Sequence, residues 1–271
     1  MTAPATADTA PLRIETRDGG LLRITLTDAK RRNALSMRII RALDEAIAAA
    51  AADPAVRVVI LAAEGPAFCA GHDLKELTAA RAGGDRGRAF FEETMTSCAR
   101  MMTAIVRCPK PVIAEIAGVA TAAGCQLVAS CDLAVAAEGS SFATPGVHIG
   151  LFCSTPMVAL SRNVARKHAM EMLLTGAATN AADAARMGLV NRVVPADRLT
   201  EETEALARVV ASKSPLTLKM GKEAFYAQAE LGLDDAYDHA ARVMVENMLA
   251  RDAEEGISAF IEKRHPVWEG R

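Results

Sequence analysis

The chain has 271 residues, just above the usual size of one domain, so we expect one large domain with an appendage. Apolar residues make up 51% and charged residues 24%, which is typical of a soluble globule with a substantial core. The formal net charge of −2 disfavours a basic surface for nucleic acid. The sequence also has no stretch near the roughly 18 to 20 uninterrupted apolar residues of a membrane span.

The first residues carry no recognisable targeting signal. Residues 1–11 lack a positively charged segment followed by an apolar one, and they contain Asp8 and no Arg, which disfavours a secretory signal or a transit peptide. We therefore predict a disordered N-terminus over residues 1–11 and a cytoplasmic location. The six cysteines form no C-x-x-C pair and lie among apolar residues, so we expect small buried side chains in a reducing compartment.

The first half of the chain alternates patterns typical of strands and helices. Residues 12–16 and 21–25 alternate apolar and polar side chains around Asp18-Gly19-Gly20, which predicts a β-hairpin. Ser36 is the expected N-cap of an amphipathic helix over residues 37–52. Three short, almost wholly apolar runs predict strands that are covered on both faces: 56–62, 111–116 and 133–136.

From residue 156 onward the pattern is helical, apart from a short extended piece over 189–194. We therefore predict an α/β core over residues 12–200, followed by a C-terminal helical region over residues 201–271. No repeat or linker separates the two parts. The predicted helices cover residues 167–174, 181–187, 201–212, 215–229, 235–249 and 252–264.

Two loops of small residues follow two of the predicted buried strands. Residues 68–75 read Phe-Cys-Ala-Gly-His-Asp-Leu-Lys, and residues 117–126 read Ala-Gly-Val-Ala-Thr-Ala-Ala-Gly-Cys-Gln. Each loop opens into a helix whose first N–H groups have no partner inside the helix. Two such junctions can direct two backbone N–H groups at one carbonyl oxygen on which negative charge develops. Close packing of helix on strand would require the same small residues, so the residues alone leave both interpretations open.

In order and spacing, these loops together with Asn33-Ala34-Leu35 and Cys131-Asp132 resemble the crotonase (enoyl-CoA hydratase/isomerase) superfamily. The match covers residues 12–271 and continues through 142–151, 188–190 and 260–264. The resemblance implies a spiral of ββα turns that binds an acyl-CoA thioester, with C-terminal helices that form a homotrimer or a homohexamer. It implies no metal, and no cofactor other than the coenzyme A (CoA) of the substrate.

The resemblance also assigns binding roles to individual positions. It places an oxyanion hole at the backbone N–H groups of His72 and Ala123, so we interpret the His72 imidazole as part of the pocket wall rather than as a catalytic group. In the family, the positions that match Arg31, Lys75 and Lys263 lie near the CoA phosphates, and the position that matches Phe260 contacts the adenine end. The alternative is that the three cations are simply solvated and that Phe260 belongs to the core. The substrate-binding positions implied in this way are Arg31, Ala70, Gly71, Asp73, Leu74, Lys75, Phe260 and Lys263.

The sequence departs from the family pattern where hydration chemistry is carried out. Hydratases of the family use two glutamates around a catalytic water, and the matching residues here are Gln126 and Gly146. An amide can orient a water but cannot accept its proton, and the loss of one acid–base group typically costs about 10²- to 10⁴-fold in rate. Efficient hydration is therefore not expected. If the scaffold is otherwise intact, glutamates at both positions should restore it.

Several residues are candidates to replace the missing glutamates. His148 is the most attractive base by its ordinary pKa, although a structural histidine is the alternative. Cys153 with its two hydroxyl neighbours could supply a nucleophile or simply suit a tight turn, and we interpret Asp73 as a helix cap and Asp132 as structural. The open functions are an acyl-CoA enzyme that stabilises a thioester enolate, an acyl-CoA hydrolase or decarboxylase, and a catalytically silent acyl-CoA-binding oligomer.

Overall fold

The computed structural model describes residues 10–271. Most of the N-terminal segment for which disorder is predicted lies outside the described residues. Ala10 and Pro11, the two that are described, are attached to the body of the protein through Thr27. Its hydroxyl donates to the Ala10 carbonyl at 2.7 Å, and its N–H donates to the Pro11 carbonyl at 3.2 Å. Residues 10 and 11, which fall within the segment predicted to be disordered, are therefore held in place.

The larger of the two sheets has six strands, in the order β1-β2-β3-β5-β7-β10. The first two strands form the predicted antiparallel hairpin, and every later strand is parallel to its neighbour. The three predicted apolar strands are confirmed, and they are buried because helices cover them. The strands are β1 (Leu12–Arg17), β2 (Leu21–Leu26), β3 (Val58–Ala63), β5 (Val112–Ile116), β7 (Leu133–Ala137) and β10 (Arg192–Val194).

A second, four-stranded sheet has the order β4-β6-β8-β9 and is not predicted from the sequence. Its strands are two or three residues long, so they are too short to show an alternation of apolar and polar residues. They are β4 (Ala67–Cys69), β6 (Val119–Thr121), β8 (Ser141–Ala143) and β9 (Thr179–Asn180). The two small-residue loops begin in this sheet, since β4 leads into one and β6 into the other.

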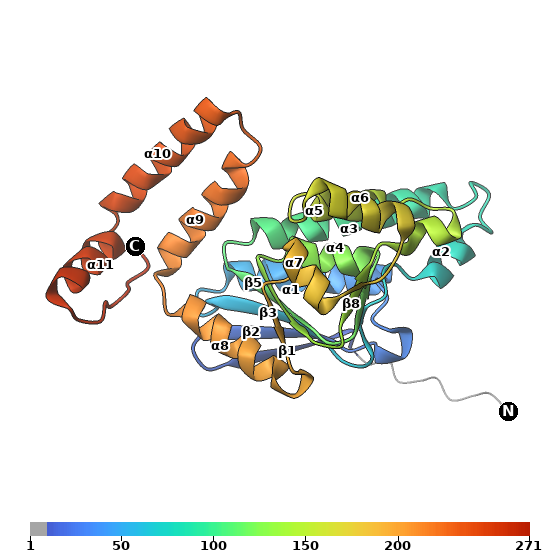
Figure 1. Ribbon diagram of the computed structural model, residues 1–271, viewed down its shortest axis with the longest axis horizontal. Helices are drawn as coiled ribbons and strands as arrows, with labels where there is room; N and C mark the ends of the chain where they lie inside the picture. Colours follow the sequence, from blue (N-terminus) through green and yellow to red (C-terminus); the bar gives the residue numbers. More distant parts are fainter. Residues whose placement is uncertain (1–9) are drawn as a thin grey trace.

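Helices pack over the two sheets (Figure 1). The predicted helix over 37–52 is confirmed as α1, and the Ser36 hydroxyl accepts a hydrogen bond from the Ile39 N–H at 3.3 Å. Short 3₁₀ helices cover residues 29–31, 145–149 and 196–198. The α-helices of this part are α1 (Met37–Ala52), α2 (Leu74–Ala80), α3 (Arg88–Arg107), α4 (Ala123–Ser130), α5 (Ser154–Leu160), α6 (Arg166–Thr175) and α7 (Ala181–Met187).

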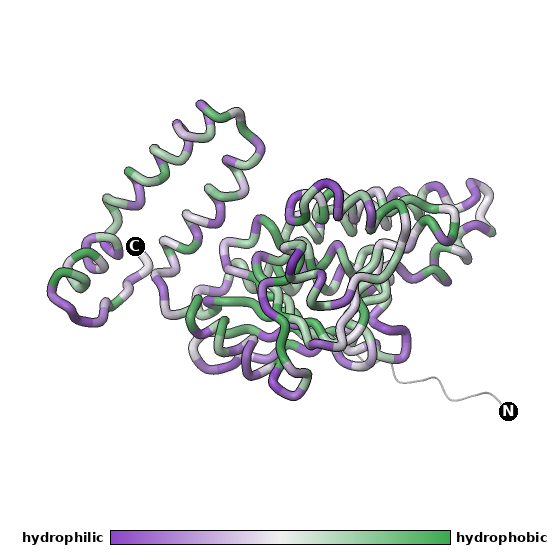
Figure 2. The backbone as a smooth tube through the Cα atoms, viewed as in Figure 1, coloured by the Kyte–Doolittle hydropathy of each residue, from purple (hydrophilic) through white to green (hydrophobic). Residues whose placement is uncertain are grey.

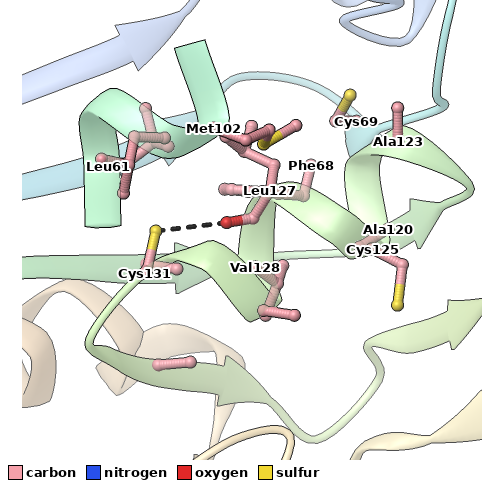
Figure 3. Close-up of a cluster of buried hydrophobic side chains, with 14 of the residues drawn as sticks. Leu61, Phe68, Cys69, Met102, Ala120, Ala123, Cys125, Leu127, Val128 and Cys131 are labelled. Atoms are coloured by element: carbon pink, nitrogen blue, oxygen red, sulfur yellow. Dashed lines mark hydrogen bonds between the residues drawn. The ribbon is translucent and has the colours of Figure 1, made fainter. Parts of the chain in front are cut away.

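The helix α4 runs through the centre of the hydrophobic core, and all of its residues are buried. Figure 3 shows its side chains among those of Phe68 and Met102. The last turn is closed by Cys131, whose thiol donates to the Leu127 carbonyl at 3.3 Å. The six cysteines are all buried free thiols, which confirms the prediction made from their surroundings.

The C-terminal helices divide into one that belongs to the core and three that leave it. The helix α8 (Leu199–Ala211) packs Leu199 and Ala207 against the six-stranded sheet. By contrast, α9 (Pro215–Gln228), α10 (Leu233–Leu249) and α11 (Arg251–Glu262) extend to one side of the body (Figure 1). Within the predicted helical region, the extension therefore follows α8. Among the described residues, no helix combines the length and the apolar character that crossing a membrane requires.

Candidate functional site

The two small-residue loops lie directly against each other. Gly71 has a φ of +88°, and a Cβ there would come within 3.0 Å of the Ala122 Cβ and 3.5 Å of the Ala123 nitrogen. A Cβ on Gly124 would come within 2.1 Å of the Cys69 carbonyl oxygen. Only glycine allows such close contact between two backbones. The start of α2 is thus held at a fixed position relative to the start of α4.

The backbone N–H of His72 is directed away from its neighbouring strand segment. The Leu35 N–H donates to the Gly71 carbonyl at 2.7 Å, and the Asp73 N–H donates to the Leu35 carbonyl at 3.3 Å. In this parallel bridge the residue between the two bonded groups turns its own N–H to the other side. Within residues 10–271, the His72 N–H has no acceptor.

The N–H of Ala123 lies at the first turn of α4, where no acceptor exists inside the helix. The preceding residue, Ala122, has φ 50° and ψ −118°, a conformation that residues with a side chain rarely adopt. Two hydrogen bonds hold it there. Its N–H donates to the Ala143 carbonyl at 2.9 Å, and its carbonyl accepts from the Gln126 N–H at 3.0 Å. Backbone strain maintained in this way is typical of functional loops.

Polar side chains near these two amides lack partners. Gln126 is only 5% exposed, and its Oε1 atom has no hydrogen-bond partner among the described residues. The same holds for the buried Nε2 atom of His72. Burial also lowers the pKa of His72, because the charged imidazolium would be shielded from water and would have no compensating partner. The imidazole is therefore neutral at neutral pH.

At the second glutamate position, the space for a side chain is already filled. A Cβ on Gly146 would come within 2.8 Å of the Leu151 carbonyl oxygen and 2.9 Å of the Cys153 sulfur. A carboxylate therefore cannot be added at residue 146 without moving the backbone around it. The expectation that glutamates at 126 and 146 would together restore hydration stays a prediction, and it requires the loop around residue 146 to shift.

The two candidates to replace the missing glutamates, His148 and Cys153, are respectively hydrogen-bonded and protonated. The His148 Nε2 atom lies 2.9 Å from the Thr175 carbonyl, to which it donates, at the C-terminal end of α6. To act as a base through this nitrogen, His148 would first have to break that bond. Burial raises the pKa of the Cys153 thiol, so the thiol is protonated at neutral pH and a poor nucleophile. The structure thus favours the structural interpretation of both residues.

The two aspartates have the structural roles predicted for them. The Asp73 carboxylate caps α2 by accepting from the Lys75 N–H at 2.8 Å and the Glu76 N–H at 3.4 Å. The Asp132 carboxylate accepts from the Val112 N–H at 2.7 Å, and it binds two residues of α9. These two, Lys222 and Tyr226, lie about 90 residues further along the chain, and no sequence pattern connects them to Asp132. The described residues contain no cluster of three or more potential metal ligands from His, Cys, Asp and Glu.

The predicted CoA-binding residues fall into two groups that one chain does not bring together. Lys75 is exposed on α2, and the side chain of Arg31, 64% exposed, lies 3.9 Å from the Asp73 carboxylate. Phe260, which is 85% exposed, and Lys263 lie at the end of α11. Figure 1 shows α11 and α2 at opposite ends of the molecule.

Comparisons with known proteins agree with this fold. The sequence model of the enoyl-CoA hydratase/isomerase family matches residues 16–271. The chain belongs to that family. A crystal structure of an enoyl-CoA hydratase from Mycobacterium smegmatis superimposes with a TM-score of 0.91 at 49% identity, covering 95% of this chain and 98% of the other. The human enoyl-CoA hydratase domain-containing protein 3 superimposes with a TM-score of 0.89 at 46% identity, covering 95% and 100%. The crotonase fold implied by the sequence motifs is thereby confirmed.

Curated members of the family correct one prediction. The chain is 49% identical to the mitochondrial enoyl-CoA hydratase domain-containing protein 3 of Xenopus laevis, covering 95% of this chain and 86% of that protein. It is 47% identical to the mitochondrial protein of the same name from Rattus norvegicus, covering 98% and 87%. The prediction of a cytoplasmic location is wrong in light of these relatives, which are named as mitochondrial. It rested on the composition of the first residues alone, and residues 1–9 lie outside the structural description.

Proposed function

We propose that this family member binds an acyl-CoA thioester whose carbonyl oxygen accepts hydrogen bonds from the N–H groups of His72 and Ala123. The observation that carries the proposal is that neither N–H group has an acceptor within residues 10–271, on two loops that pack closely together at Gly71 and Gly124. A preorganised pair of donors stabilises a thioester oxygen as it gains negative charge, and the loss of one such donor typically costs about 10²- to 10³-fold in rate.

The reaction that we propose passes through a thioester enolate. We do not propose that the protein is an efficient hydratase. Gln126 is neutral, and Gly146 offers neither a side chain nor the space for one. Decarboxylation generates an enolate directly, because the electron pair of the broken C–C bond flows toward the thioester carbonyl without a base. The first candidate is an acyl-CoA enzyme that stabilises a thioester enolate. The filled space at residue 146 favours an acyl-CoA decarboxylase as the second candidate. In neither case does the proposed reaction involve a cofactor or metal.

For the CoA moiety we propose a site that is completed by a second copy of the chain. Lys75 and Arg31 would bind phosphates at the site described here, since cations on flexible stems suit an exposed anion. Phe260 and Lys263 lie too far away within one chain, so a neighbouring chain would have to supply them. The exposed aromatic ring of Phe260 is the sort of group that binds the flat face of adenine.

The surface of α9 to α11 supports an oligomer, which we propose to be a trimer or a hexamer. Apolar residues, green in Figure 2, recur along all three helices, and many of their side chains are exposed in the single chain. An apolar surface of this extent marks an interaction site rather than a solvated face. The most exposed of these apolar side chains are Phe225, Leu233, Tyr237, Met244, Leu249, Phe260 and Ile261.

A proline substitution provides a direct test of the proposed donor pair. Ala123→Pro removes one N–H at the first residue of α4, where no bond within the helix is lost. Because the proline ring must fit beside Gly71 and after the unusual backbone of Ala122, binding is measured on the folded fraction. The matched control is Arg166→Pro, which removes an N–H at the first residue of α6. We expect Ala123→Pro to weaken the binding of crotonyl-CoA, malonyl-CoA and butyryl-CoA in calorimetric titrations, and to abolish turnover of any of them. Arg166→Pro should leave both unchanged.

The outcomes separate the proposed functions. Turnover by the native protein that disappears in Ala123→Pro supports an enolate-stabilising enzyme, and release of CO₂ from malonyl-CoA identifies the decarboxylase. Binding without turnover would show a silent acyl-CoA-binding protein. If the native protein binds none of the three thioesters, or if folded Ala123→Pro binds them as tightly as the native protein, the donor pair is not the site. Hydration of crotonyl-CoA at ordinary enzyme rates would contradict our interpretation of Gln126 and Gly146.

A further inference from the structure

The segment that follows α11 folds back onto the point where α9 leaves the core. Residues 264–271, here called the tail, run toward residues 212–214, the link between α8 and α9. The Trp268 indole N–H donates to the Ser212 carbonyl at 2.8 Å, and a Cβ on Gly270 would come within 3.3 Å of the proline that begins α9. Figure 1 shows the end of the chain, marked C, beside the start of α9. The chain therefore passes along α9, α10 and α11 and returns to the link from which these helices extend.

Glu255, in the first half of α11, holds the near part of the tail. Its carboxylate accepts from two nitrogens of the Arg264 guanidinium at 2.6 and 3.0 Å, and from the Val267 N–H at 2.9 Å. These donors, Arg264 above all, lower the pKa of Glu255 to about 2, so the carboxylate stays charged over the ordinary pH range. The tail is thus attached to α11 before it reaches the link.

Asp252 holds the far part of the tail and joins it to the link. The residue is buried, with only 2% of its surface exposed. Its carboxylate accepts from the Glu269 N–H at 2.7 Å, the Gly270 N–H at 3.1 Å and the Ser214 hydroxyl at 2.5 Å. Its own N–H donates to the Arg271 carbonyl at 2.9 Å. One residue thereby connects α11, the tail and the link.

The buried Asp252 carboxylate depends on the tail for most of its partners. Among the described residues it forms no ion pair, so N–H and O–H donors alone compensate for its removal from water. Without the tail, the Ser214 hydroxyl would be the one donor left to it. An open tail would therefore leave a buried charge poorly paired, which favours the closed arrangement.

The link is held from the core as well. Arg57, just before β3, donates to the Ala211 carbonyl at 3.0 Å and to the Lys213 carbonyl at 2.6 Å. The link therefore has bonds to the core on one side and to the tail and α11 on the other. A connection of a few residues can act as a hinge unless such bonds restrict its backbone.

We infer that the tail is an internal strap that fixes α11 relative to the core, and that Asp252 is the positioning residue that keeps it closed. Phe260 lies in the last turn of α11 and Lys263 directly follows the helix, so the strap also sets the position of these two side chains. That consequence rests on the proposed CoA site, which a neighbouring chain completes with Phe260 and Lys263. The strap itself does not depend on that proposal.

Cleavage by trypsin after Lys213 tests the strap. Lys213 is exposed in the link, and Arg86, exposed between α2 and α3, provides a reference site in the same chain. Asp252→Asn replaces one acceptor oxygen by a donor, and Trp268→Phe removes the indole N–H but keeps an aromatic ring. We expect the ratio of cleavage after Lys213 to cleavage after Arg86 to rise in both variants. The rise should be about tenfold in Asp252→Asn and about threefold in Trp268→Phe, as hydrogen bonds to a charged and to a neutral group predict.

Glu254→Gln is the matched control. Glu254 lies in the same first turn of α11, but its side chain is 70% exposed and binds Arg251 at 2.9 Å instead of the tail. The substitution should leave the cleavage ratio unchanged. Unchanged ratios in both Asp252→Asn and Trp268→Phe would overturn the inference, and so would an equal rise in the control.

Binding of butyryl-CoA tests the effect on the shared site. Asp252→Asn should raise the Kd about tenfold, the loss expected when one base loses its aromatic partner. The double variant with Phe260→Ala should bind no more weakly than the weaker of the two single variants, because both act on the same contact. Fully additive effects, or no effect of Asp252→Asn, would exclude the positioning role. If the native protein binds no acyl-CoA, the proposed function fails, and the cleavage ratios still decide the strap.

Discussion

Gly124 lies so close to Cys69 that a Cβ at residue 124 would come within 2.1 Å of the Cys69 carbonyl oxygen and 2.8 Å of its carbonyl carbon. This contact joins the end of β4 to the first turn of α4. It fixes the distance between the segment that contains His72 and the segment that contains Ala123. The geometry of the candidate site therefore depends on the absence of one side-chain atom at residue 124.

Gly124→Ala should damage both stability and binding. The contact is with backbone atoms, which cannot rotate away, so α4 must shift relative to β4. We expect a loss of about 1 to 3 kcal/mol in the free energy of unfolding, as for other overpacked cores, measured by urea denaturation. Acyl-CoA binding should weaken by more than tenfold in the fraction that remains folded. Gly139→Ala is the control, because a Cβ there meets no atom within 4 Å. Equal stability of the two variants would contradict the steric argument.

The partly buried His72 should make the protein less stable in mild acid. Its pKa is lowered in the folded state by burial, so the unfolded chain binds more protons than the folded chain as the pH falls below the ordinary histidine value of about 6.5. Protons then favour the unfolded state, and the free energy of unfolding decreases from about pH 7.5 to 5.5. His72→Gln, which cannot titrate, should show a smaller decrease over the same range in denaturant titrations. An identical pH dependence for both proteins would contradict this role of His72.

The attachment of α9 to the core depends on a buried ion pair. The Lys222 ammonium group, on a side chain only 8% exposed, lies 2.6 Å from the carboxylate of Asp132, whose side chain is 16% exposed. It also donates to the carbonyls of Ile105 and Lys110, at 3.2 and 3.1 Å. Asp132→Asn leaves this cation buried without its counter-charge, and we expect a loss of about 3 kcal/mol in unfolding free energy.

Denaturant unfolding together with limited proteolysis between α8 and α9 measures this effect. Glu230→Gln is the matched control, because Glu230 forms an exposed ion pair with Arg162 that should contribute less than about 1 kcal/mol. Faster cleavage in Asp132→Asn than in Glu230→Gln would show that the ion pair holds α9 in place. A loss in Asp132→Asn no larger than that in the control would show that the two carbonyls alone are sufficient partners for Lys222.

Much of the fold could be predicted from the sequence, because its main elements carry strong local patterns. The helix that begins after Ser36 has a cap and a clear apolar face, β3 is an unbroken apolar run, and β5 is apolar apart from Glu115. The small sheet could not be predicted, since strands such as β4 and β9 are held by neighbours distant in the chain rather than by their own composition. The packing of α8 against the sheet could not be predicted either, because the sequence pattern of an amphipathic helix does not identify the surface on which its apolar face packs.

The candidate site could likewise be predicted only in part from the sequence. The glycines at 71 and 124 and the residue types at 126 and 146 can be read directly from the sequence, and the glycines mark two loops that the structure places against each other. The unusual backbone of Ala122 could not be predicted, because alanine gives no sign of a positive φ. Nor could the bond of His148 to the Thr175 carbonyl, or the filling of the space beside Gly146, since both depend on tertiary contacts.

The space beside Gly146 leads to a last prediction, about whether residue 146 can carry a side chain. Gly146→Ala should lower the free energy of unfolding by about 1 to 3 kcal/mol, because its Cβ would come within 2.8 Å of the Leu151 carbonyl oxygen and 2.9 Å of the Cys153 sulfur. Cys153→Ala removes the sulfur but leaves the carbonyl. The double variant should therefore recover part of the loss, which a double-mutant cycle measures as a favourable coupling. Gly84→Ala, with no atom within 4 Å of the added Cβ, is the control. Additive effects of the two substitutions would show that the Cys153 sulfur does not contribute to the steric obstruction. A loss in Gly146→Ala no larger than in Gly84→Ala would show that the loop moves freely and that residue 146 has space for a side chain.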